Sequence, residues 1–207
     1  MPPVHVDPRR VIEAEDAKTF ETWLARHWES ETEVWIKVHK VRSGQASITP
    51  AEAIDVALCW GWIDAIRKAF DEKSFLQRYT PRGKKSVWSQ INVANVERLA
   101  GAGRMKPPGL AQVEAAKSDG RWEKAYRIAG NETPPDLLAA VRAAPKAAAT
   151  YETLSSQNRF ALTFRIIQLK TAAGRAKKIA DLVAMLARGE TLHPDRKRVA
   201  AVTRRVR

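Results

Sequence analysis

The stretch CWGWIDAIRKAFDEKSFLQRYTPRGKKSVWSQIN, residues 59–92, concentrates the side chains that could do chemistry. It holds three of the chain's seven tryptophans, the carboxylate of Asp64, and a run of arginines and lysines. Indole rings offer apolar surface and one N–H donor, and guanidinium groups bind carboxylates and phosphates. This composition predicts a site for a negatively charged ligand, but it does not indicate a particular reaction.

Two segments within this stretch are expected to form a β-hairpin. WIDAIRKAF (62–70) and SFLQRYT (74–80) contain the aromatic and β-branched residues that favour strands. With DEKS as the loop, Arg67 lies directly opposite Arg78 on the neighbouring strand. Two like charges that face each other across a strand pair repel, unless both reach water or an anion lies between them.

Arg82 follows just beyond the hairpin, and Asp64 lies near its start. Because side chains alternate between the faces of a strand, Asp64 points away from the arginines unless a β-bulge intervenes. Either a carboxylate of the protein or a phosphate-like or carboxylate ligand would neutralise the cations. The pattern therefore predicts an anion-accepting cleft, with Trp62 or Trp88 as an apolar wall.

The same residues also have structural interpretations. Trp62 and Trp88 could simply pack in the core, and the arginines could belong to a salt-bridge network. Lys84 and Lys85 are expected in a solvated loop.

Motifs for metals, nucleotides and acyl transfer are missing from the sequence. The four histidines have no metal-binding spacing, and neither GxGxxG, Walker A nor GxSxG occurs. Cys59, the single cysteine, is expected to be a buried, inert thiol. We therefore expect no metal and no cofactor and assign no catalytic residue, and an enzyme with Asp64 as general base stays an alternative.

The net charge of +13 is unevenly spread. Residues 159–207 carry 13 Lys and Arg against three acids, a net charge of +10. The end RKRVAAVTRRVR and the basic helix before it predict nucleic-acid binding as an alternative function. The same charges could instead belong to a solvated helix face and a frayed tail. The lone cysteine and the lack of a signal peptide or apolar span predict a cytoplasmic protein that does not span a membrane.

The expected fold class is α+β. A small antiparallel sheet with packed helices comes first, and an all-helical C-terminal region follows. Capping residues such as Thr49 and Ser89 mark helix starts, and RWEKAYRIAG (121–130) is expected to be a short helical piece. We expect an N-terminal domain at 13–130, a helical domain at 135–190 and a basic tail at 191–207.

Several ordered motifs resemble the YdeI/OmpD-associated family, often labelled bacteriocin-protection proteins. They are ALCWGWIDAIRK (57–68), RYTPRGKKSVWSQIN (78–92), GRMKPPGL (103–110) and AAKSDGRW (115–122), and GRAKKIADLV is similar to the family's C-terminal helix. The resemblance covers about residues 23–186. It implies an α+β part followed by a helical part and a link to envelope or antimicrobial-peptide stress, and it implies no established reaction.

Together these inferences predict a cytoplasmic, stress-linked binding protein whose cleft accepts an anionic small molecule or an acidic peptide. The candidate ligand-binding residues are Lys40, Trp62, Asp64, Arg67, Arg78, Arg82, Ser86, Trp88 and Asn92.

Overall fold

The computed structural model describes residues 5–127 and 132–194. The chain divides into two compact units, Met1–Tyr126 and Arg127–Arg207. The first is α+β and the second is helical, which confirms the predicted fold class. Most of the predicted basic tail, residues 195–207, lies outside the described residues, and so does the part of the expected nucleic-acid interface that falls on it.

A four-stranded sheet forms the framework of the first unit, in the order β1-β2-β4-β3. Its strands are β1 (Val11–Glu13), β2 (Val34–His39), β3 (Trp62–Ala69) and β4 (Ser74–Pro81). Both β2 and β3 run antiparallel to β4, as expected for a hairpin meander. The sheet is nevertheless mixed, because the short strand β1 pairs with β2 in parallel.

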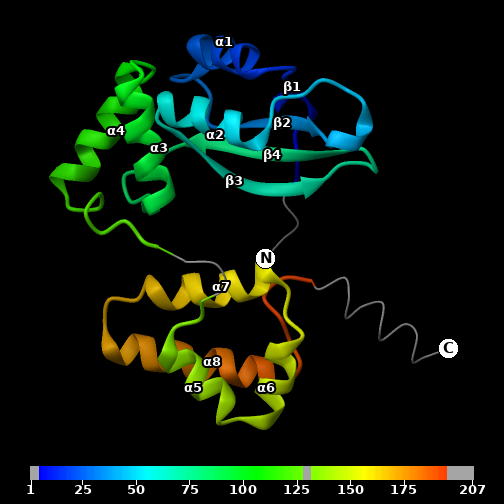
Figure 1. Ribbon diagram of the computed structural model, residues 1–207, viewed down its shortest axis with the longest axis vertical. Helices are drawn as coiled ribbons and strands as arrows, with labels where there is room; N and C mark the ends of the chain where they lie inside the picture. The colour runs from blue at the N-terminus through cyan, green and yellow to red at the C-terminus, as the bar shows by residue number, and fades with distance from the viewer. Residues whose placement is uncertain (1–4, 128–131, 195–207) are drawn as a thin grey trace. The chain divides into compact units, whose positions relative to one another are not determined.

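Four helices accompany this sheet, with α1 and α2 lying over one face and α3 and α4 beside it (Figure 1). Their bounds are α1 (Ala17–His27), α2 (Pro50–Cys59), α3 (Gln90–Gly101) and α4 (Pro107–Ser118), and short 3-10 turns occur at Pro8–Arg10 and Val41–Ser43. The predicted start of α2 is confirmed. Thr49 Oγ1 accepts from the N–H of Glu52 at 3.2 Å, and Glu52 Oε2 accepts from the N–H of Thr49 at 2.9 Å.

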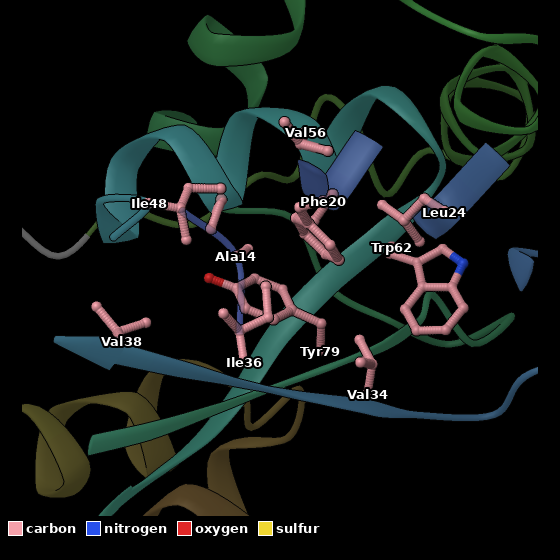
Figure 2. Close-up of a cluster of buried hydrophobic side chains, with 12 residues drawn as sticks. Ala14, Phe20, Leu24, Val34, Ile36, Val38, Ile48, Val56, Trp62 and Tyr79 are labelled. Atoms are coloured by element: carbon pink, nitrogen blue, oxygen red, sulfur yellow. The ribbon is translucent and has the colours of Figure 1, made fainter. Parts of the chain in front are cut away.

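The main core lies between α1, α2 and the sheet. Phe20 and Leu24 of α1 point toward Ile36 of β2, Tyr79 of β4 and Trp62 of β3 (Figure 2). All five are fully or almost fully buried. The apolar face of the hairpin is therefore packed against the helices.

A second core cluster gathers α2, α3 and α4 around Trp88 and Leu99. Close packing of α2 against α4 depends on Gly109, because a Cβ there would lie 2.2 Å from the carbonyl oxygen of Cys59. Gly61 connects α2 to β3 with a φ of +74°, a left-handed conformation that favours glycine. This cluster positions the segment that follows β4.

The second unit consists of α5 (Pro135–Arg142), α6 (Pro145–Glu152), α7 (Ser156–Ile167) and α8 (Ala172–Ala187). Leu137, Leu162 and Leu186 are among its buried core residues. Asn158 is also buried. Its amide donates to the carbonyl of His193 at 3.1 Å and accepts from the N–H of the same residue at 2.9 Å, which fastens the segment after α8 to α7.

Candidate functional site

The register of the β3–β4 hairpin differs from the prediction. Asp64 faces Tyr79, but an irregularity between Asp64 and Arg67 shifts the pairing by one residue, so that Arg67 faces Gln77. The predicted opposition of Arg67 and Arg78 is therefore wrong. The bulge instead places Arg67 on the same face as Asp64, because paired residues of antiparallel strands share a face.

Arg67 and Arg78 both have partners among the protein's own side chains. Arg78 forms an ion pair with Glu33, with Nε 2.6 Å from Oε2. Arg67 donates from Nε to Gln77 Oε1 at 3.0 Å, and its guanidinium lies 4.3 Å from the centre of the Phe75 ring. The structure thus contradicts the predicted pair of guanidinium groups held side by side around an anion.

Two more predicted residues lie away from the other candidates. Lys40 lies at the hairpin tip, where its ammonium donates to the carbonyls of Asp71 and Glu72 at 3.4 and 2.7 Å. Strands of this length span roughly 25 Å, so Lys40 does not share a site with residues at the other end of β4. Trp62 is a core residue whose Nε1 donates to the carbonyl of Trp28 at 3.3 Å, and it forms no ligand wall.

Arg82 is the predicted site residue with unusual surroundings. It follows β4, and its backbone N–H donates to the carbonyl of Gly61 at 3.0 Å. Its side chain is buried at 5% exposure, and the guanidinium lies 3.6 Å from the centre of the Trp88 ring. Nη1 donates to the carbonyl of Val87 at 3.4 Å, whereas Nε and Nη2 have no hydrogen-bond partner among the residues that the structure describes.

Burial dominates the electrostatics of this region. It lowers the pKa of Arg82 from 12.5 to about 10, although the charge of Asp64 acts in the opposite direction. Burial also raises the pKa of Asp64, and the charges of Arg82 and Arg67 reduce that shift. For Tyr126, burial and the charge of Asp64 together raise the pKa of the phenol. Within the described ranges no ion pair joins Asp64 to Arg82, so the two charges interact only through space.

Ser86 and Asn92 support the backbone around Arg82. Ser86 Oγ accepts from the N–H of Gly83 at 3.0 Å, which closes the loop after β4. Ser89 caps α3 as predicted, accepting from the N–H of Asn92 at 3.2 Å. Ser86 therefore shapes the loop before Trp88, whereas Asn92 contributes its backbone N–H to the helix start after it.

Tyr126 and Arg121 are site residues that the sequence reasoning missed. The predicted helix at 121–130 is absent from residues 121–127, which form turns and a bridge between Tyr126 and Ser89. The N–H of Tyr126 donates to the carbonyl of Trp88 at 2.9 Å. Arg121 Nε contacts both carboxylate oxygens of Asp119 at 2.8 Å, and its Nη1 donates to the carbonyl of Ser86 at 2.9 Å. The sequence motif SDGRW indicated that this segment was of interest, but it did not predict the contacts of Arg121 and Tyr126.

Two further properties concern the described residues as a whole. Across residues 5–127 and 132–194, no three His, Cys, Asp or Glu side chains gather in a way that could hold a metal ion. No described helix is both long enough and apolar enough to cross a membrane.

The fold and site define a chain with an α+β unit that buries one incompletely paired arginine, followed by a helical unit. Residues 132–189 match the family described as Bacteriocin-protection, YdeI or OmpD-Associated, and residues 12–112 match a Domain of unknown function (DUF8412). The predicted resemblance to the bacteriocin-protection family is therefore confirmed for residues 132–189. Three of the four N-terminal motifs lie inside the range of the other match. No curated protein and no solved structure matched the chain.

Proposed function

We propose that the first unit is a binding module for a small anionic molecule and that Arg82 is its anchor. The observation that carries this proposal is the pair of buried, unpartnered nitrogens, Nε and Nη2, among the described residues. Buried polar groups are nearly always hydrogen-bonded, and leaving a charged donor unpaired is unfavourable. An oxygen-rich anion would supply the missing acceptors.

The neighbouring side chains support an anion rather than a cation. Arg82 and Arg67 both act electrostatically on Asp64, so the cations near this carboxylate outnumber it. Trp88 holds the guanidinium by its face, which leaves the edge for hydrogen bonds. Both unpartnered nitrogens lie below the surface, so a ligand reaches them only after a neighbouring group moves aside.

The wider role that we propose is that of a cytoplasmic, stress-linked binding protein of the bacteriocin-protection type. The family match of the second unit supports this role. A second function, an enzyme with Asp64 as general base, is favoured by one observation, the raised pKa of this partly buried carboxyl. It would require turnover of a bound anion, and Asp64→Asn would abolish that turnover without abolishing binding.

Thermal unfolding in the presence of single anions tests the binding proposal. Phosphate, sulfate and a series of carboxylates are added to the wild type, to Arg82→Gln and to Arg78→Gln. A ligand at a hundred times its Kd stabilises the folded state by about 2.7 kcal/mol.

We expect at least one anion to stabilise the wild type and Arg78→Gln but not Arg82→Gln. The Arg78 variant is the matched control because its guanidinium already has an acidic partner. Equal stabilisation of both variants, or none of the wild type by any of the anions, would contradict the proposal.

A further inference from the structure

We propose that the group bound by Arg82 is a carboxylate, held side-on by Nε and Nη2. This inference rests on the proposed function and narrows it to one class of ligand.

The first argument is the geometry of the free edge. Nη1 donates to the carbonyl of Val87, and Trp88 covers a face of the guanidinium. The two unpartnered atoms, Nε and Nη2, lie on the same edge of the planar group, where their N–H bonds point in parallel. This fork matches the spacing of the two oxygens of a carboxylate.

The second argument is the amount of positive charge that is available. A phosphate dianion in a buried site needs several cationic or backbone donors. Arg121 is already paired with Asp119, and Asp64 offsets one of the two charges of Arg67 and Arg82. The surroundings of Arg82 therefore carry a single net positive charge, which matches a monoanion.

The third argument concerns the N-terminus of α3, which begins close to Trp88. Helix N-termini often bind phosphate through free backbone N–H groups. Here the N–H of Gln90 donates to the carbonyl of Tyr126 at 2.9 Å, and the N–H of Asn92 donates to Ser89. These two N–H groups of the helix start are therefore already used within the protein and do not replace the missing cations.

Asp64 adds a pH dependence to carboxylate binding. Arg82 after β4 and Arg67 on the same strand act on it, and its charge acts in turn on Tyr79 of β4 and Tyr126 after α4. A second carboxylate brought to Arg82 repels the Asp64 anion and favours its protonated form. Binding is therefore expected to take up a proton and to strengthen as the pH falls toward the raised pKa of Asp64.

Isothermal titration calorimetry of the full chain with chosen probes tests this inference. The probes are acetate, benzoate, the neutral isostere benzamide, methylphosphonate and inorganic phosphate, each at pH 6 and pH 8. The variants are Arg82→Lys, which keeps the charge but removes the fork, and Arg78→Lys as the matched control. Asp64→Asn removes the group that takes up the proton.

We expect a carboxylate to bind more tightly than benzamide, methylphosphonate or phosphate. Arg82→Lys should weaken carboxylate binding about tenfold or more, because the paired hydrogen bonds to a charged group are lost. Arg78→Lys should bind like the wild type, and Asp64→Asn should bind equally at both pH values.

Phosphate or methylphosphonate binding as tightly as a carboxylate would overturn the inference while leaving the proposed function intact. If Arg82→Lys binds carboxylates as tightly as the wild type, Nε and Nη2 of Arg82 do not hold the carboxylate side-on. If the wild type binds benzamide as tightly as benzoate, the inference is contradicted without the use of any variant. If none of the anions binds, the proposed function fails as well.

Discussion

Replacing Arg82 with Met separates a role in binding from a role in stability. Methionine is unbranched and of similar length, so it fills much of the same space without carrying a charge. If the guanidinium holds the fold together, its loss destabilises the first unit. If it is kept for a ligand, its loss relieves an unfavourable burial.

The magnitude follows from the pKa of Arg82, which burial lowers from 12.5 to about 10. One pKa unit corresponds to about 1.4 kcal/mol, so burial disfavours the charged form in the folded state by about 3 kcal/mol. Because the folded-state pKa is the lower one, this penalty is fully present at pH 7 and is relieved only as the pH rises through 10.

Two favourable contacts are lost in the same variant. The stacking of Arg82 on Trp88 contributes about 1 kcal/mol, and the long hydrogen bond to Val87 contributes about 1 kcal/mol. The difference predicts that Arg82→Met is about 1 kcal/mol more stable than the wild type at pH 7.

Urea unfolding followed by tryptophan fluorescence measures this difference. All seven tryptophans lie between residues 23 and 122, so the signal reports on the first unit. Arg78→Met is the matched control and should lose about 1 kcal/mol, because Arg78 forms a partly exposed ion pair with Glu33. A loss of more than about 2 kcal/mol in Arg82→Met would refute the reasoning.

Three further predictions concern other parts of the chain. Asp64→Asn should be more stable than the wild type at pH 7, because burial disfavours the charged form of Asp64 in the folded state. The difference in stability should vanish as the pH falls through the raised pKa of Asp64 toward 3.8, where the folded wild type takes up a proton. Urea unfolding at several pH values measures this difference, and a difference that does not change with pH would contradict the prediction. Gly109→Ala should destabilise the first unit by about 3 kcal/mol, because the new Cβ would lie 2.2 Å from the carbonyl oxygen of Cys59 at the end of α2. Gly101→Ala is the control and should not be destabilised, since its Cβ would meet no atom within 4 Å. Equal melting temperatures of the two variants would contradict the prediction. Asn158→Ala should lower the free energy of unfolding by about 2 kcal/mol, because its buried amide is hydrogen-bonded to the backbone of His193. Gln157→Ala is the control and should change the stability very little, since this side chain is exposed. Similar losses of stability in the two variants, measured by calorimetry, would contradict the role of Asn158 in holding the segment after α8.

Local signals in the sequence predicted most of the elements. Thr49 and Ser89 each accept a backbone N–H three residues later, as helix caps do, so α2 and α3 begin where the sequence placed them. The hairpin was predicted correctly because the strand preference of its residues is also local. Each of these features depends on residues that are close together in the chain.

The register and the ion pairs could not be predicted in the same way. A bulge between Asp64 and Arg67 shifts Arg67 by one position relative to β4. No residue type near the bulge predicts it from the sequence. Arg78 finds its partner in Glu33, which lies on the approach to another strand. Such contacts are settled by packing between distant segments, so the predicted arginine pair failed although both of its strands exist.

Arg82 also explains why the proposed binding site lies next to α3 rather than on the hairpin. Arg67 and Arg78 are satisfied by side chains of the protein, so a ligand gains little by meeting them. Burial disfavours the charged form of Arg82 in the folded state by about 3 kcal/mol. A carboxylate that supplies the missing hydrogen bonds would recover part of this free energy, which corresponds to an increase in affinity of up to about a hundredfold. A single substitution at Arg82 should therefore raise stability and lower affinity at the same time, whereas a purely structural arginine would show a loss of stability alone.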